Sequence, residues 1–239
     1  MNAPHDTGDD SGLPGRETTA GGKTFAIGVT GASGAVLAER LVAVLLEKGH
    51  TVHLCASRTG RLVIHEELVA PRRNESGAGD IGTGESGSGT SRETDAGRRT
   101  IFPHLSHPRL IEWGERNFHA PFASGSAPFD GMAIIPCSLA TVAAIAHGFS
   151  DNLLRRGAEV MLKEKRRLVV VPRESPLSEI HLENLLTLAR AGGTIIPPVL
   201  TFYQQPGDTV APQVEFVVSR VLDHLGVAND LYPRWGVDA

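Results

Sequence analysis

The sequence of 239 residues contains little cysteine, few aromatic residues and no long hydrophobic run. Its two cysteines, Cys55 and Cys137, form neither a C-x-x-C pair nor a cluster with metal-ligand spacing, and each lies at the end of an apolar run. No apolar stretch approaches the roughly 18 residues that a membrane span needs, and the N-terminus lacks the apolar core of a secretory signal. We therefore expect a cytoplasmic protein with reduced cysteines and no membrane association.

An excess of positive charge is also missing. The formal net charge is −4 and the isoelectric point lies near 6.2, which gives no electrostatic argument for nucleic-acid binding. The basic cluster "KEKRR" (163–167) is balanced by acidic residues elsewhere. Hydrophobic residues, in contrast, make up 41% of the chain, enough for the core of one α/β domain of about 150–200 residues.

Two segments hold almost no residues that could form a core. In residues 1–22 the only large aliphatic residue is Leu13, and the glycine- and serine-rich stretch within 71–100 has only Ile81. Such segments cannot bury enough apolar surface to compensate for the entropy lost on ordering. We predict a disordered tail at 1–22 and a disordered, low-complexity insertion at 71–100 within one domain that spans 23–236.

The rest of the chain alternates between short apolar runs and amphipathic segments. This alternation favours an α/β fold, namely a three-layer, doubly wound parallel sheet of the Rossmann or flavodoxin type. Ligands of such sheets bind at the carboxyl ends of the strands, where this chain has small, polar or reactive residues. The predicted strands are 24–30, 51–57, 131–137, 167–172 and 193–199, and the predicted helices are 35–49, 59–70, 138–147, 152–165, 178–191 and 210–225.

The loop after the first strand, in "VTGASGA", offers free amides and a close backbone approach to an anion. No lysine follows Gly34, as a Walker A loop requires. No acidic residue ends the second strand, where an NAD site holds the ribose. The loop therefore suits a phosphate without an adenosine, which fits FMN. In "PCSLAT" (136–141), Ser138 and Thr141 open a second helix, either as an anion site or as an ordinary N-cap. A buried, structural Cys137 is favoured over a nucleophile.

Several loop motifs occur together and in order. They are "VTGASGA", "ASGS" (123–126), "PCSLAT", "AIAHGFSDNLLRRGAEVMLKEKRRLVVVPRESP", "HLENLLTLARAGGTIIPP" and "FYQQP". Over roughly residues 24–70 and 110–236 the chain resembles the UbiX/Pad-type flavin prenyltransferases. The resemblance implies an enzyme that joins a dimethylallyl group from dimethylallyl phosphate to N5 and C6 of reduced FMN, with no metal required. It also implies a UbiD-type decarboxylase as recipient of the prenylated FMN, and a homo-oligomer, often a dodecamer, with active sites at subunit interfaces.

The resemblance also assigns roles to individual residues. Loss of phosphate from an allylic substrate needs cations and hydrogen-bond donors at the leaving group, and a proton donor helps it depart. We expect Glu174 to be the acid/base, assisted by Ser33, with Lys163 and Arg173 also catalytic. Substrate-binding residues are then Lys163, Arg173, Tyr203, Arg220 and Glu67. FMN-binding residues are Gly31, Ala32, Ser33, Ser57, Ser138, Leu139, Ala140, Thr141 and Arg156, the last open to a shift of one residue because Arg155 precedes it.

Three other functions stay open. An FMN-dependent cysteine decarboxylase of the phosphopantothenoylcysteine type would use a histidine near the position of His65, but its "PxMN" stretch is missing here. A non-catalytic FMN carrier would have no use for Glu174, Lys163 and Tyr203. A direct aromatic-acid decarboxylase would act without a partner. The chain departs from the family pattern at Phe118, where the family commonly has tryptophan.

Overall fold

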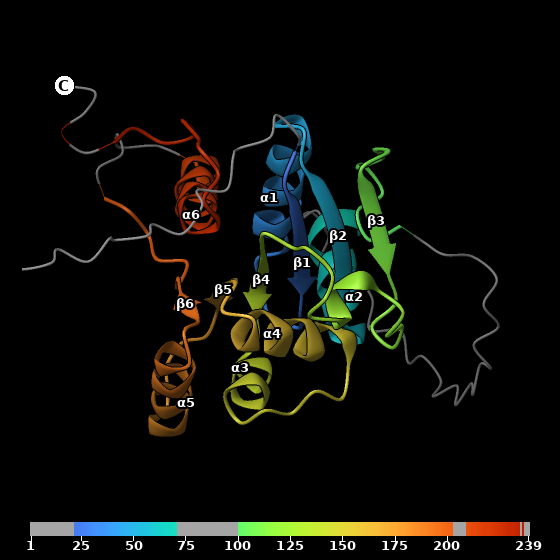
Figure 1. Cartoon of the computed structure of the whole chain (residues 1–239). Helices are drawn as coiled ribbons and strands as arrows, with labels where there is room; N and C mark the ends of the chain where they lie inside the picture. The colour runs from blue at the N-terminus through green and yellow to red at the C-terminus, as the bar shows by residue number, and fades with distance from the viewer. Residues whose placement is uncertain (1–21, 71–99, 203–208, 235, 237–239) are drawn as a thin grey trace, which may run out of the picture.

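A parallel sheet with helices on both faces forms the centre of the computed structural model, which describes residues 22–70, 100–202, 209–234 and 236 (Figure 1). The six strands of the described residues run in the order β3-β2-β1-β4-β5-β6, and every neighbouring pair is parallel. The doubly wound fold is thus confirmed, with its switch point between β1 and β4. The strands are β1 (Thr24–Val29), β2 (Thr51–Ala56), β3 (Leu110–Trp113), β4 (Gly131–Cys137), β5 (Arg167–Pro172) and β6 (Thr194–Ile195).

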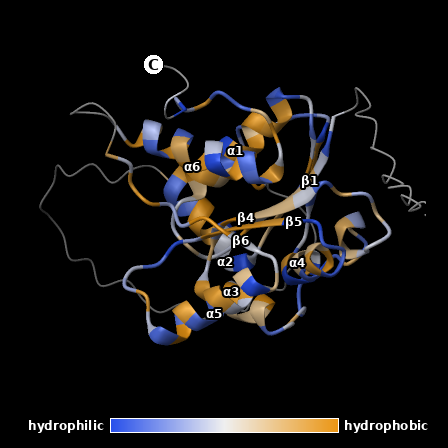
Figure 2. Cartoon of the chain, turned by 60° about the vertical axis from the view of Figure 1, so that its left-hand side comes forward, coloured by the Kyte–Doolittle hydropathy of each residue, from blue (hydrophilic) through white to orange (hydrophobic). Residues whose placement is uncertain are grey.

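The helices form two layers. α1 (Ala35–Glu47) and α6 (Val210–Leu225) pack together over one face of the sheet, and α3 (Leu139–Ala146), α4 (Leu153–Lys163) and α5 (Glu179–Arg190) cover the other (Figure 2). Shorter helical segments are α2 (Arg58–Ile64), the π-helix η1 (His65–Val69) and the 3-10 turn η2 (Pro121–Ala123). None of these helices is long and apolar enough to cross a membrane.

The central strands are buried on both faces, which explains why their sequences are almost entirely apolar. In β1, Phe25 and Ile27 face the cluster made with α1 and α6, whereas Ala26 faces the cluster made with α3, α4 and α5. Gly28 also lies inside, because a Cβ at this position would stand 2.7 Å from Leu154. The alternation places successive strand residues in different layers.

Most predicted elements match the structure within one or two residues, and the differences have local causes. The predicted strand at 193–199 is only two residues long, since Pro197 and Pro198 have no amide hydrogen for a ladder. The predicted helix at 59–70 changes to a π-helix at His65. The edge strand β3 was not predicted, because none of its four residues is buried, Ile111 is exposed, and the strand has no long apolar run.

Three predictions concern residues that lie outside the described part of the chain. These are the N-terminal tail (1–22, of which only Gly22 is described), the insertion (71–100, of which only Thr100 is described) and Tyr203. Their roles remain predictions.

Candidate functional site

The loops that follow β1 and β5 meet at the carboxyl edge of the sheet. Arg173 Nε donates to the carbonyl oxygen of Ser33 at 3.4 Å, across 140 residues of sequence. The Arg173 backbone amide donates to the Cys137 carbonyl at 3.2 Å, which ties the same loop to the end of β4. Two residues that the sequence assigned to catalysis therefore lie side by side, and both side chains are exposed.

A cavity of about 230 Å³ lies at the same edge. The N-caps of three helices line it, Ser57 for α2, Ser138 for α3 and Asn152 for α4. Their side-chain oxygens accept from backbone amides of the first turn at 3.0, 3.4 and 3.0 Å respectively. Helix N-termini carry partial positive charge, so the cavity favours an anionic group.

The floor of this cavity is held by buried hydrogen bonds. Thr30 Oγ1 accepts from the Ser138 amide at 2.7 Å and donates to the Pro136 carbonyl at 3.2 Å. Ser138 and Thr141 also join their hydroxyls at 3.0 Å. Of the residues predicted to bind FMN, Ser57, Ser138, Ala140 and Thr141 line the cavity.

The two neighbouring arginines of α4 point to different surroundings. Arg155 lines the cavity, and its Nη1 donates to Asp151 at 2.7 Å. Arg156 Nε instead donates to the Ala123 carbonyl at 3.1 Å, and its Nη1 pairs with Glu159 at 3.0 Å. Hydrogen bonds from Ser150 and then Arg156 hold the pKa of Glu159 below its usual range. In a single chain, Arg156 thus supports the "ASGS" segment, and Arg155 faces the cavity.

The glycine-rich turn departs from its prediction in one respect. Gly34 has a φ of 117°, a conformation that an L side chain rarely adopts. The Glu67 carboxylate accepts from the Gly34 amide at 3.0 Å and from the Ala35 amide at 2.7 Å. The amides that the sequence offered to a ligand phosphate therefore already hold a carboxylate of the same chain. Glu67 thus binds the amides of the two residues that follow Ser33, the predicted catalytic serine, in the sequence.

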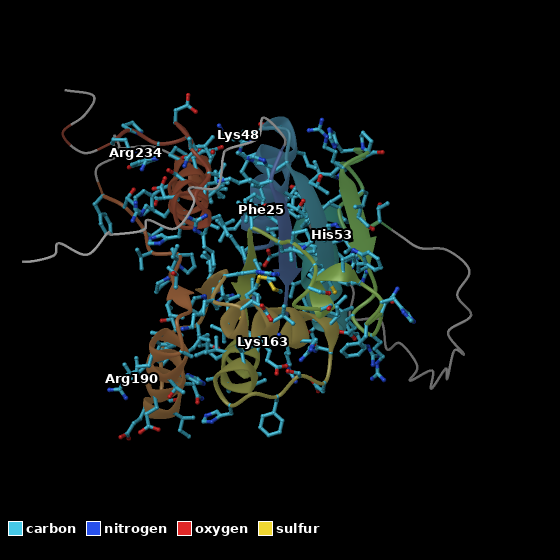
Figure 3. All side chains as sticks on the ribbon, in the orientation of Figure 1. Phe25, Lys48, His53, Lys163, Arg190 and Arg234 are labelled. Atoms are coloured by element: carbon cyan, nitrogen blue, oxygen red, sulfur yellow. The ribbon has the colours of Figure 1, made fainter. Side chains whose placement is uncertain are left out.

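Lys163 and Arg220 lie elsewhere in the single chain. Lys163 ends α4, eight residues and about 12 Å along the helix from Arg155, and it contacts Glu164 (Figure 3). Arg220 pairs with Asp223 at 2.9 Å, near the end of α6 that contacts the first residue of β5. Within one chain these two predicted site residues therefore lie toward the edge of the sheet where its strands begin, away from Glu174, and their roles remain predictions.

Charged groups keep Arg220 in its place. Burial alone would raise the pKa of Asp223, but the hydrogen bond from Arg234 and further partners outweigh it, so the pKa lies below its usual value. Arg234 donates to both carboxylate oxygens, at 2.7 and 2.8 Å. Asp223 is therefore an anion that binds both Arg220 and Arg234. This contact lies at the amino edge of the sheet, which is the edge where its strands begin.

The remaining candidates are an acidic residue, two cysteines and a histidine. Glu174 is exposed beside Arg173 and accepts from the Ser175 amide at 3.0 Å. Burial raises the pKa of both Cys55 and Cys137 to about 12, so neither is a nucleophile at neutral pH. His65 is exposed, 3.9 Å from Glu66. In the described ranges no three His, Cys, Asp or Glu side chains gather as a metal site would require.

Sequence reasoning missed Glu115, Asn152 and Thr59 as cavity residues. The stretch "SDNLLRR" does indicate an N-cap at Asn152, because an asparagine directly before a periodic apolar run is typical of the start of a helix. Glu115 follows the unpredicted strand β3, so no sequence signal located it at the carboxyl edge.

Comparisons with known proteins agree with one another. The family model named Flavoprotein matches residues 15–226. The flavin prenyltransferase UbiX of Halalkalibacterium halodurans is 43% identical, over 89% of this chain and 93% of its own. The crystal structure of AnUbiX (PadA1) in complex with FMN and dimethylallyl pyrophosphate is 33% identical, with a TM-score of 0.70 over 90% of this chain and 98% of the other. A dodecameric FMN-dependent UbiX-like decarboxylase from Escherichia coli O157:H7 is 36% identical, with a TM-score of 0.68, over 89% and 98%.

The cysteine decarboxylases are more distant. The FMN-dependent cysteine decarboxylase TvaF from thioviridamide biosynthesis has a TM-score of 0.51 at 13% identity, over 86% of this chain and 99% of its own. This likeness concerns the fold alone.

Proposed function

The chain belongs to the UbiX family of flavin prenyltransferases, and we propose that it transfers a dimethylallyl group from dimethylallyl phosphate to reduced FMN. The observation that carries the residue-level proposal is the contact between Arg173 and the Ser33 carbonyl. This contact joins the loop after β1, which carries the Ser33 hydroxyl, to the loop after β5, which carries the Arg173 guanidinium and the Glu174 carboxylate. The proposed transfer needs both loops. Among the family's relatives, FMN and a dimethylallyl ester are bound together in AnUbiX.

The residues present fit FMN. Three helix N-caps converge on one cavity, which suits the phosphate of the flavin tail. A Cβ at Gly31 would stand 2.6 Å from Thr59, so only glycine leaves the turn open here. Ser57, Ser138, Ala140 and Thr141 would hold the tail, with Gly31, Ala32 and Ser33 along the β1 loop. Reduced FMN, when bound, supplies the nucleophilic N5 and C6 atoms to which the prenyl group is joined.

Glu174 is proposed to move protons at the leaving phosphate. Its carboxyl group lies one residue from Arg173, whose guanidinium would bind the phosphate and stabilise the charge that develops as the C–O bond breaks. A carboxylic acid there donates a proton to the departing phosphate. The same carboxylate, with the Ser33 hydroxyl, then takes up the proton lost when carbon bonds to the ring. Bonds to N5 and C6 would release two protons. One would replace the proton that Glu174 gave to the phosphate, and the other would go to the former alkene carbon of the prenyl group, so the flavin would gain C5H8 and the phosphate would leave protonated.

The phosphate clamp is proposed to form between copies of the chain. Lys163 and Arg220 are too far from Glu174 to act with it within one chain, because they lie at the other edge of the sheet. A second copy could bring its own Lys163 and Arg220 to the carboxyl edge of the first. The dodecameric UbiX-like relative supports such an assembly. Tyr203 is proposed to join the same clamp.

The proposal extends to substrate and recipient. The relative AnUbiX binds dimethylallyl pyrophosphate; we propose the monophosphate as the donor, and a UbiD-type decarboxylase as the recipient of the prenylated flavin. Two structural relatives of more than 30% identity carry decarboxylase in their names. Release of CO₂ from an aromatic acid by the purified chain alone would therefore favour a direct decarboxylase.

One anaerobic experiment tests the proposal. The protein is mixed with reduced FMN and either dimethylallyl phosphate or the pyrophosphate, and the extracted flavin is examined by mass spectrometry. A mass gain of one C5H8 unit is expected, faster with the monophosphate. Bound but unmodified FMN with both donors would contradict the proposal and favour an FMN carrier.

A further inference from the structure

We propose that Arg234 is a positioning residue for the phosphate clamp: by holding the carboxylate of Asp223, it leaves the guanidinium of Arg220 available to the phosphate of the prenyl donor. The inference rests on the proposed function, since Arg220 is one of the residues proposed to bind that phosphate. Arg234 and Asp223 do not bind the donor themselves. They set how tightly the chain holds Arg220 before the donor arrives at the carboxyl edge of a second copy.

Asp223 binds its two arginines unequally. Arg234 donates from Nη1 to one carboxylate oxygen at 2.8 Å and from Nη2 to the other at 2.7 Å. Arg220 donates from Nη1 alone, at 2.9 Å, to the same oxygen that Arg234 Nη1 binds. A guanidinium that binds both oxygens of a carboxylate is held more strongly than one with a single contact. Arg220 is therefore the partner that Asp223 gives up more easily.

The charges of this contact leave one cation in excess, because two guanidinium groups share one carboxylate. Asn229 Nδ2 also donates to Asp223 Oδ1 at 3.0 Å. When Arg220 moves to a phosphate, Asp223 keeps its two hydrogen bonds from Arg234 and the one from Asn229. The Asp223 side chain is only 20% exposed, and a partly buried carboxylate without a cation would be costly. Arg234 removes this cost.

Without Arg234 the balance reverses. Arg220 and Asp223 would then form a pair with no net charge, and Arg220 could bind a phosphate only by leaving the carboxylate. Of the contacts described above, Asp223 would keep only the one from Asn229. Asp223 would thus compete with the phosphate for Arg220, and the donor would bind more weakly.

Arg234 is held in place by contacts other than this carboxylate. Its Nη2 also donates to the Asn229 carbonyl at 3.1 Å. Two residues earlier, the ring of Tyr232 lies edge-on against Phe216 of α6, with centroids 5.0 Å apart, and its hydroxyl is 3.3 Å from that of Thr201. The chain after α6 therefore turns back along this helix, which places Arg234 beside α6 (Figure 3). Its position is a property of the fold and does not depend on the donor.

The test separates binding of the donor from its conversion. Isothermal titration calorimetry with oxidised FMN present measures the dissociation constant of dimethylallyl phosphate, because the oxidised flavin is not nucleophilic and leaves the donor unreacted. Anaerobic single turnover with reduced FMN measures the rate of prenyl transfer at saturating donor. Thermal unfolding of each variant shows whether it is folded. The variants are Arg234→Gln, Arg234→Lys, Asp223→Asn, Arg220→Gln and the double variant of Arg234→Gln with Asp223→Asn.

Arg40→Gln is the matched control. Arg40 Nε pairs with Glu215, a carboxylate of the same helix α6, at 2.8 Å, and both side chains are partly exposed. The control therefore removes an arginine from a carboxylate of α6 without touching Arg220 or Asp223.

We expect Arg234→Gln to weaken binding of dimethylallyl phosphate roughly 3- to 20-fold, with the rate of transfer at saturating donor within about threefold of the wild type. Arg234→Lys should fall between, because a lysine keeps the charge and loses the fork. Adding Asp223→Asn to Arg234→Gln should restore the affinity to within about threefold of the wild type, since the competing carboxylate is gone. Asp223→Asn alone and Arg40→Gln should not weaken binding, whereas Arg220→Gln should.

A double variant that binds the donor as weakly as Arg234→Gln would overturn the inference, since it would indicate a merely structural role for Arg234. Equal weakening by Arg40→Gln would overturn it as well. Unchanged binding in Arg220→Gln would remove Arg220 from the clamp and the inference with it, yet leave the proposed function intact as long as the wild type forms prenylated FMN. A wild type that forms none would overturn the proposed function together with the inference.

Discussion

The two edges of the sheet treat their charged residues differently. At the carboxyl edge, Arg173 and Glu174 are exposed and make hydrogen bonds only to nearby backbone groups in the described structure. At the amino edge, Lys163 and Arg220 are paired with Glu164 and Asp223. The first arrangement leaves charge for a ligand, and the second satisfies charge within the chain. The difference indicates that, of the proposed phosphate clamp, one chain has Arg173 available to bind phosphate, whereas Lys163 and Arg220 are already paired with carboxylates.

This comparison also says what an oligomer would have to do. A second copy must present its amino edge to the carboxyl edge of the first and exchange an internal carboxylate partner for a phosphate. For the Lys163–Glu164 pair, whose side chains are 45% and 35% exposed, this exchange is not costly, because such pairs typically contribute about 0–1 kcal/mol. The predictions below test the comparison, in order of decreasing expected effect.

The largest effect is expected at the carboxyl edge. Glu174→Gln removes the proposed proton donor, so turnover should fall roughly 10²- to 10⁴-fold while FMN affinity is retained. Single-turnover formation of prenylated FMN, followed by mass spectrometry, measures the loss. Glu179→Gln is the matched control, since Glu179 is an exposed carboxylate in the first turn of α5. Equal activity in Glu174→Gln and Glu179→Gln would remove Glu174 from the mechanism.

The amino edge is tested by mixing subunits. Lys163→Ala and Arg173→Ala should each reduce turnover roughly 10²- to 10³-fold, because each removes a cation from the leaving phosphate. If the clamp forms between copies, oligomers reassembled from both variants contain some sites with neither substitution. Activity of the mixture should then clearly exceed that of either variant alone. Mixed oligomers without recovered activity would place both cations in one chain's site and contradict the comparison.

The fold could be predicted from the sequence because buried strands appear as short apolar runs and helix starts appear as N-cap residues, and both are local patterns. Gly34 and Gly49 stand at positive φ on either side of α1, at the predicted glycine-rich turn and at the end of the helix predicted over 35–49. Ser138 opens α3 as predicted. The neighbouring arginines of α4 could not be told apart, because the direction of a side chain one residue along a helix depends on tertiary packing. The separation of Lys163 from Glu174 was also not predictable from motif order alone.

A smaller effect is expected where the carboxyl edge depends on close packing. A Cβ at Gly60 would stand 2.5 Å from the Val29 carbonyl oxygen, so Gly60→Ala must move α2 away from the end of β1. Overpacking of this kind costs about 1–3 kcal/mol of unfolding free energy. Chemical denaturation measures it, and Gly114→Ala is the control, since nothing lies within 4 Å of a Cβ there. A difference below about 0.5 kcal/mol between the two variants would show that the backbone yields freely.

The smallest effect concerns the support beneath the carboxyl edge. His53 is 7% exposed inside the sheet (Figure 3), its Nδ1 accepts from Trp113 Nε1 at 3.0 Å, and its ring lies against Phe129. Burial lowers the pKa of His53, so below its ordinary value near 6.5 the unfolded chain binds a proton that the folded chain does not. Stability should be retained above this pH and fall as the pH drops below it, by up to about 1.4 kcal/mol per pH unit for this group.

His53→Leu removes this proton from the balance and should make the acid side of the stability profile shallower. The absolute stability at pH 8 is not the readout, because leucine also takes the acceptor from Trp113. The slope between pH 8 and pH 5, from denaturant titrations, isolates the proton. His119→Gln, at an exposed histidine, should leave the slope unchanged. Parallel profiles for the wild type and His53→Leu would contradict this prediction, because they would mean that folding does not change how many protons His53 binds.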